Sequence, residues 1–114
     1  MIENIDSPAA IASFRWLSDA EGGRRSGPPA ARVYAATCIF PLGGEAETMP
    51  GWPATATQIS ILIQRLGAEP AAQELAKVGF LVPDLAKPYL HAGAKVLVME
   101  GPKAVAHGII QDVL

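Results

Sequence analysis

The chain has 114 residues, of which 50% are hydrophobic and 18% charged, a composition typical of one folded domain and not of a disordered segment. Lys and Arg number 9 against 11 Asp and Glu, and the resulting net charge of −2 excludes a generally basic nucleic-acid-binding protein, although not a local basic patch. One Cys and two His allow no internal disulfide and supply few metal ligands, so no metal or other cofactor is expected. The first residues lack the basic start of a secretory signal, and no apolar run reaches the length of a membrane span, which predicts a cytoplasmic protein.

Residues 1–10 are expected to form a tail, and the segment after it admits two interpretations. Ser7 and Pro8 are typical of a helix start. Ala12, Phe14 and Trp16, in contrast, fall at every second position, as in a strand. A Gly- and Pro-rich loop over 21–29 precedes a predicted strand over 32–40, where aromatic and β-branched residues suit a sheet.

The most regular alternation of the chain lies in residues 55–64, where Ile59, Ile61 and Ile63 predict a core strand. Residues 69–78 predict a helix instead, because strong helix formers follow Pro70 and a glycine at 79 can end the helix. Residues 80–82 fit a short strand or a packed loop. The apolar segments 95–100 and 103–114 predict a hairpin, so the strands together indicate a small barrel or sandwich.

Several short motifs resemble the C-terminal (third) domain of bacterial elongation factor Tu. Glu100-Gly101-Pro102-Lys103 and the strand that follows are similar to the last hairpin of that domain, with its E-G-G-R turn. Leu17 to Ser26 resemble its first strand and E-G-G-R-H-T loop, and Met49-Pro50-Gly51 resembles its M-P-G-D turn. The resemblance implies an all-β fold, a six-stranded antiparallel closed barrel over residues 11–114 whose first segment is a strand. One short inserted helix is expected in an insertion at about 65–86.

The same resemblance suggests where a partner binds, because both E-G-x-basic turns lie in family loops near nucleic-acid and partner surfaces. Arg24, Arg25, Gly101 and Lys103 are therefore candidate partner-binding residues. Trp52 is a further candidate, since Trp is enriched at binding hot spots, although it can equally fold back over an open barrel end.

The family's nucleotide-binding domain has no counterpart in this chain, which lacks its phosphate-binding loop, so GTP binding in the family's manner is not expected. In the family, parts of the barrel contact the stem of aminoacyl-tRNA, and Gly101 matches one such position. Here Pro102 removes an amide donor, and Lys103 replaces an Arg whose planar fork suits phosphate. These changes and the net charge argue against RNA binding.

The nucleophile set that the sequence offers is Cys38 with His107, His91 and Asp84 or Asp112. Cys38 stands in an apolar strand, where a small buried thiol is usual, and His107 suits a structural or surface position. The carboxylates expected on a solvated surface are Glu45, Glu47, Glu69 and Glu74. The expected function is thus a non-catalytic interaction module that binds a protein partner through its loops. RNA binding and a small enzyme using Cys38 and His107 are the alternatives.

Overall fold

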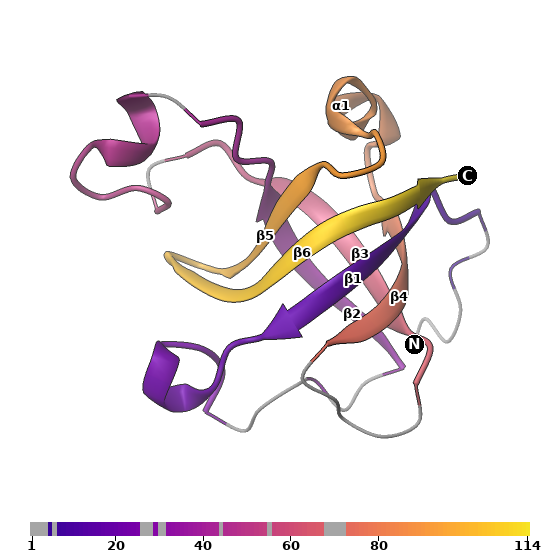
Figure 1. The fold of residues 1–114 in the computed structure, drawn as a ribbon, viewed down its shortest axis with the longest axis horizontal. Coiled ribbons are helices and arrows are strands. Elements are labelled where there is room, and N and C mark those ends of the chain that lie inside the picture. The colour runs from indigo at the N-terminus through magenta and orange to yellow at the C-terminus, as the bar shows by residue number, and fades with distance from the viewer. Residues whose placement is uncertain are drawn as a thin grey trace.

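The computed structural model shows a closed barrel of antiparallel strands and describes residues 5, 7–25, 29, 32–43, 45–54, 56–67 and 73–114 (Figure 1). Its strands are β1 (Ala10–Trp16), β2 (Val33–Ile39), β3 (Ile59–Arg65), β4 (Glu74–Phe80), β5 (Lys95–Glu100) and β6 (Lys103–Val113). Its short helical segments are η1 (Asp19–Glu21), η2 (Glu45–Thr48), α1 (Pro83–Ala86) and η3 (Lys87–Tyr89). The predicted all-β barrel of six strands with one short helix is confirmed.

The strands follow one another around the barrel in the order β1-β4-β3-β2-β5-β6. β2, β3 and β4 form a meander, and the long connection after β1 allows that strand to lie beside β4, a Greek-key arrangement. β6 closes the barrel by pairing with β1, with Phe14 opposite Gly108 and Arg15 opposite His107. Closure pairs every strand on both sides, which removes the exposed sheet edges that otherwise invite aggregation.

The barrel interior is filled by every second residue of each strand. The predicted core strand is confirmed, because Ile61 and Ile63 are buried and Ile59 packs against the same cluster. Gly108 makes room for a larger neighbour: a Cβ at this position would lie 2.5 Å from a ring carbon of Phe14. Phe14 therefore occupies interior space that any other residue at position 108 would take.

The predicted helix over 69–78 is wrong over its described part, because residues 74–80 form β4 and pair with β1 and β3. Residues 69–72 lie outside the described residues. Ala76 and Val78 point into the core, while Leu75, which a helix would bury, is 53% exposed. Strand pairing thus overrides the local helix propensity. The helical turn comes later, where Pro83 opens α1 at a position that tolerates proline. Of the ambiguous residues, Phe80 ends β4, and residues 81–82 form a bend.

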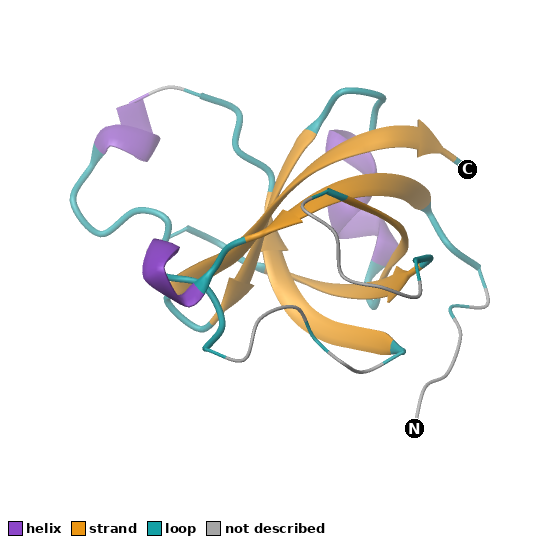
Figure 2. Ribbon diagram, turned by 60° about the horizontal axis from the view of Figure 1, so that its bottom comes forward, coloured by secondary structure: helices purple, strands orange, loops and turns teal. Residues whose placement is uncertain are grey.

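A second, smaller cluster lies on the outside of the barrel. Ile39, Leu97 and Met99 alternate with core-facing neighbours, so they point outward, yet they are buried because Trp52 and Ala56 pack over them. Trp52 and Ala56 belong to the long connection between β2 and β3, whose η2 segment stands away from the strands (Figure 2). In Figure 1, η1, the β5–β6 turn and η2 all lie at the left of the molecule.

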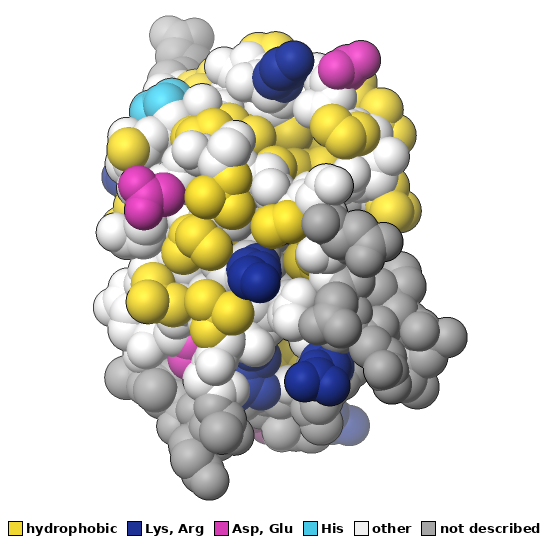
Figure 3. All heavy atoms as spheres, turned by 90° about the vertical axis from the view of Figure 1, so that its right-hand side faces the viewer, with side chains coloured by type: hydrophobic (Ala, Val, Ile, Leu, Met, Phe, Trp, Pro, Cys, Tyr) yellow, Lys and Arg dark blue, Asp and Glu magenta, His cyan; other side chains and the backbone are white. Residues whose placement is uncertain are grey.

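Hydrophobic side chains also reach the surface on the face that carries the C-terminus (Figure 3). The C-terminal half of the sequence includes several exposed leucines, among them Leu75 on β4, Leu85 in α1 and Leu114. Single exposed apolar side chains are normal in proteins, so an exposed leucine such as Leu75 does not by itself indicate a binding surface.

Candidate functional site

The two E-G-x-basic turns, far apart in the sequence, lie against each other. Nε of Arg24 donates to the carboxylate of Glu100 at 2.7 Å, and Nζ of Lys103 donates to the carbonyl oxygen of Gly23 at 3.0 Å. Each turn therefore provides the cation that the other turn binds. The candidate residues Arg24, Gly101 and Lys103 thus come together, and both cations contact the fold itself.

The first of these turns is organised by a capping box. The Ser18 hydroxyl accepts from the backbone N–H of Glu21, whose carboxylate accepts from the Ser18 N–H at 3.0 Å and pairs with Arg15 at 2.9 Å. The Ser18 backbone N–H, and then the Arg15 guanidinium, lower the pKa of Glu21 to about 2. Gly23 follows, and a Cβ there would lie 2.2 Å from the carbonyl oxygen of Leu17, so this position requires glycine.

Glu100 is the centre of contacts at the second turn. The Tyr34 hydroxyl donates to its carboxylate, and the guanidinium carbon of Arg24 lies 5.4 Å from the centroid of the Tyr34 ring. Burial, followed by the bond to Glu100, raises the pKa of Tyr34. Nε2 of Gln58 donates to the carbonyl oxygen of Gly101 at 3.1 Å, and the φ of Gly101, +59°, is one that favours glycine. Side chains from β2 and the approach to β3 therefore hold the turn in place.

The charges at this end of the barrel alternate in sign. Arg24 pairs with Glu100, and Arg15 pairs with Glu21, while the neighbouring Arg25 is exposed. The local basic patch that the sequence allowed around Arg24 and Arg25 is therefore, in the described part of the chain, a surface of mixed charge, with Arg25 next to the ion-paired Arg24.

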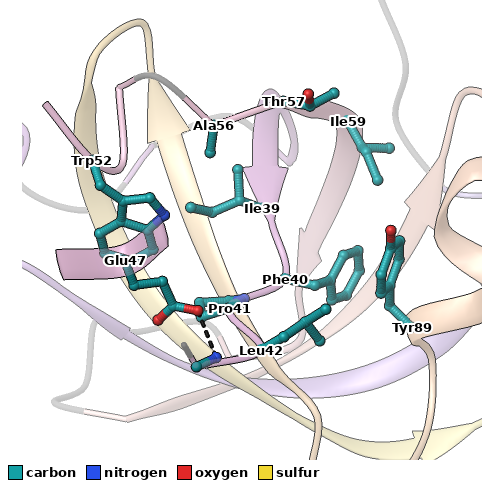
Figure 4. A pocket seen from close by; sticks show the side chains of 11 residues that line it. Ile39, Phe40, Pro41, Leu42, Glu47, Trp52, Ala56, Thr57, Ile59 and Tyr89 are labelled. Carbon is teal, nitrogen blue, oxygen red and sulfur yellow. Dashed lines mark hydrogen bonds between the residues drawn. The ribbon is translucent and has the colours of Figure 1, made fainter. Parts of the chain in front are cut away.

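Trp52, the remaining candidate residue, lies on the outer face of the barrel and does not cover an open end. Its half-buried indole packs on the cluster of Ile39, Leu97 and Met99. Beside the indole is a groove of about 270 Å³, whose opposite wall is the stacked pair of Phe40 and Tyr89 (Figure 4). We call it the Trp52 groove; its described lining residues are Ile39, Phe40, Pro41, Leu42, Gly43, Glu47, Trp52, Ala56, Thr57, Ile59 and Tyr89.

The shape of the Trp52 groove depends on contacts within its own walls. The rings of Phe40 and Tyr89 have centroids 5.3 Å apart and planes inclined by 13°, so the residue that follows β2 and the end of η3 present one aromatic surface. The carboxylate of Glu47 accepts from the backbone N–H of Gly43 at 2.6 Å, which ties η2 to the end of β2 (Figure 4). Leu42 projects at the rim and is 75% exposed. The groove is therefore apolar and open to a ligand.

A second hollow, of about 380 Å³, adjoins the Trp52 groove, and both share Pro41 and Trp52 as lining residues. We call it the Lys95 hollow. It lies over the outer face of β5 and β6, where Lys95 is opposite Ile109 and Leu97 is opposite His107. Its lining residues are Pro41, Trp52, Lys95, Val96, Leu97, His107, Gly108 and Ile109.

The nucleophile set proposed from the sequence does not come together. Cys38 is fully buried in the barrel interior, and this burial raises the pKa of its thiol to about 12. His107 is exposed on the outside of the barrel, so the two side chains lie on opposite faces of the sheet. His91 is exposed, with Nδ1 3.1 Å from the carbonyl oxygen of Ala92, and the carboxylates of Asp84 and Asp112 are exposed as well.

Sequence reasoning missed a buried ion pair. The expectation of a solvated Glu74 is wrong. Arg65 donates to its carboxylate through Nη2 at 2.5 Å and Nε at 3.1 Å. The side chain of Glu74 is 3% exposed and that of Arg65 is 14% exposed. Nη1 of Arg65 also donates to the carbonyl oxygen of Pro29 at 2.7 Å, which joins the β1–β2 connection to β3 and β4. Glu69, which is also expected to be solvated, lies outside the described residues.

Among the residues that the structure describes, no group of His, Cys, Asp and Glu has the arrangement of a metal site. The same residues include no helix with the length and hydropathy needed to cross a bilayer. Comparison of the chain with models of protein families and with curated proteins found no match. The groove, the hollow and the interlocked turns are therefore interpreted from their own chemistry.

Proposed function

We propose that this protein is a non-catalytic binding module that holds an extended segment of a partner protein in the Trp52 groove. The observation that carries the proposal is an open apolar groove with a Trp wall, an aromatic wall of Phe40 and Tyr89, and an exposed rim residue, Leu42. Burial of apolar surface is the main favourable contribution to most protein association. Aromatic side chains at the centre of an interface contribute most of its binding free energy.

The groove is also formed before any partner arrives. Phe40 and Tyr89 stack on each other, and Trp52 rests on buried outward-facing side chains. Walls of this kind lose little conformational freedom on binding, so less of the interaction free energy is spent on ordering them. Aromatic-lined grooves of several peptide-binding domains recognise proline-rich extended segments. By this analogy we expect an extended segment, and not a helix, to occupy the Trp52 groove.

The wider proposal retains the likeness to the third barrel domain of elongation factor Tu, and with it a cytoplasmic, translation-related role. The closed six-stranded antiparallel barrel is compatible with that likeness. The contact between the two E-G-x-basic turns supports it further, since the motifs that suggested the family are joined by Arg24 and Lys103. In this proposal Arg24, Gly101 and Lys103 hold the loop end in shape, Arg25 lies at the margin, and Trp52 contacts the partner.

The proposal is tested by selecting binders from a random peptide library fused ahead of a phage coat protein, with this protein as the target. Selected peptides are expected to bind in solution and to change the fluorescence of Trp52. Leu42→Ala and Trp52→Ala are each expected to weaken the binding by about tenfold or more, as truncation of a hot-spot residue does.

Leu75→Ala is the matched control, because Leu75 is also an exposed leucine but lies on β4. Its affinity for the selected peptides is expected to equal that of the wild type. Leu42 is largely exposed, so Leu42→Ala is expected to leave thermal unfolding unchanged, and its loss of binding then reports on the groove alone. Selected peptides that bind Leu42→Ala and Trp52→Ala as tightly as the wild type would refute the proposal.

A further inference from the structure

The Lys95 hollow has a charge character that the adjoining groove does not have. Two of its eight lining residues, Lys95 and His107, are basic, and none is acidic. Within the described part of the chain, neither side chain has a hydrogen-bond or ion-pair partner; Lys103, in contrast, bonds to Gly23. Glu47 is the charged residue lining the Trp52 groove. The two adjoining depressions therefore differ in sign.

Strand register brings the two donors of the hollow close together. Leu97 on β5 lies directly opposite His107 on β6, and Lys95 is two residues before Leu97 on the same outer face. Lys95 and His107 are thus diagonal neighbours, with backbones about 7–8 Å apart. An ammonium group and an imidazole N–H at this spacing can approach the two oxygens of one carboxylate.

The apolar surface of the hollow lies next to these donors. Leu97 is buried beneath the indole of Trp52, and Ile109, directly opposite Lys95, is 42% exposed. A ligand that contacts both the basic pair and the apolar surface must carry a carboxylate and a bulky apolar side chain on the same residue or on adjacent residues. In an extended peptide, neighbouring side chains point to opposite faces, so an acidic residue and an adjacent apolar residue do not enter one hollow together. A C-terminal residue does present both groups, because its α-carboxylate and its side chain share one Cα.

From this complementarity, and resting on the proposed function, we infer that the Lys95 hollow receives the C-terminal residue of the partner. The α-carboxylate lies between Lys95 and His107, and the apolar side chain packs on Leu97, Ile109 and the indole of Trp52. The preceding residues of the partner then continue past Pro41 into the Trp52 groove, since both depressions share that residue.

The test compares an acetylated Gly-Gly-Ser-Leu peptide that has a free C-terminal carboxylate with the same peptide as its C-terminal amide. Affinity is measured by NMR titration, with the backbone amides of Leu97 and Ile109, which the variants leave unchanged, as reporters. The acid is expected to bind about tenfold or more tightly than the amide. Lys95→Gln combined with His107→Gln is expected to reduce the affinity for the acid to that for the amide, whereas Lys77→Gln, a lysine change on β4, leaves it unchanged.

Equal affinities for acid and amide, or an acid affinity that the double substitution leaves unaltered, would overturn the inference. Decanoate is the third probe: if it binds as tightly as the peptide acid, the hollow takes small amphiphilic carboxylates and the assignment to a protein C-terminus is wrong. The library peptides used above are selected while fused to the coat protein and are measured in solution as C-terminal amides, so they have no free C-terminal carboxylate. Their binding at Leu42 therefore stands or fails independently of this result.

Discussion

Removal of the Glu74 carboxylate is the most informative perturbation of this fold. Glu74→Leu leaves the Arg65 guanidinium, 14% exposed, with the Pro29 carbonyl as its remaining bond among those described. Breaking a buried pair by removing one partner costs about 3–5 kcal/mol, because the other charge stays desolvated. Since Arg65 retains some contact with solvent, we expect the lower end, about 3 kcal/mol. For a domain of this size, that loss lowers the Tm by roughly 10 °C.

The assay is urea unfolding followed by circular dichroism, with a double-mutant cycle. Arg65→Met combined with Glu74→Leu is expected to be more stable than Glu74→Leu alone, because the second change removes the unpaired charge. Arg15→Met is the control, since the Arg15–Glu21 pair is about half exposed and such pairs contribute little. A Glu74→Leu variant as stable as the wild type, or a double variant less stable than the single one, would refute the reasoning.

Three further predictions concern the core, the thiol and the capping box. Gly108→Ala is expected to cost about 1–3 kcal/mol in urea unfolding, because the new Cβ collides with the Phe14 ring; unchanged stability would contradict this packing. Cys38, with a pKa raised to about 12 by burial, is expected to react with Ellman's reagent at pH 8 only after denaturation, and equally fast reaction of the native chain would show the thiol to be accessible. The neutral Cys38 thiol favours the folded state, and this contribution to the free energy of unfolding is present below about pH 9 and is lost as the pH rises through 12. Glu21, whose folded pKa is about 2, stabilises η1 above its ordinary pKa of 4.5 and loses this effect as the pH falls through 2; a carboxyl NMR titration with a midpoint near 4.5 would contradict the capping box.

The fold was predictable where the local pattern and the tertiary environment agree. Ile59, Ile61 and Ile63 alternate in the sequence because one face of β3 is buried, so the pattern alone indicates the strand. The hairpin of β5 and β6 is equally local, since Gly101 takes the backbone conformation that the turn needs. The close contact of the two E-G-x-basic turns, in contrast, depends on pairing between strands far apart in the chain.

The candidate site was predictable only in part. Trp52 was proposed as a binding residue from its residue type, but its groove requires Phe40 and Tyr89, which stack once the segment after β2 and η3 are brought together. Lys95 and His107 carry no local signal of a site, because their proximity comes from the register of β5 and β6. Single residues with strong chemical character are therefore visible in the sequence, whereas their partners across the sheet are not.

The sequence by itself indicated a small all-β barrel or sandwich, because apolar residues alternate in segments separated by Gly and Pro. The choice of a closed six-stranded barrel rested on the resemblance to the elongation factor Tu domain, and the structure confirms the barrel. Only the tertiary structure decided the state of residues 74–80, whose Ala, Leu and Lys favour a helix in isolation. β1 and β3 each offer a line of unpaired backbone groups beside this segment, and pairing with both buries Ala76 and Val78. Hydrogen bonds to two neighbouring strands and burial of one face together outweigh propensity differences of less than about 1 kcal/mol per residue.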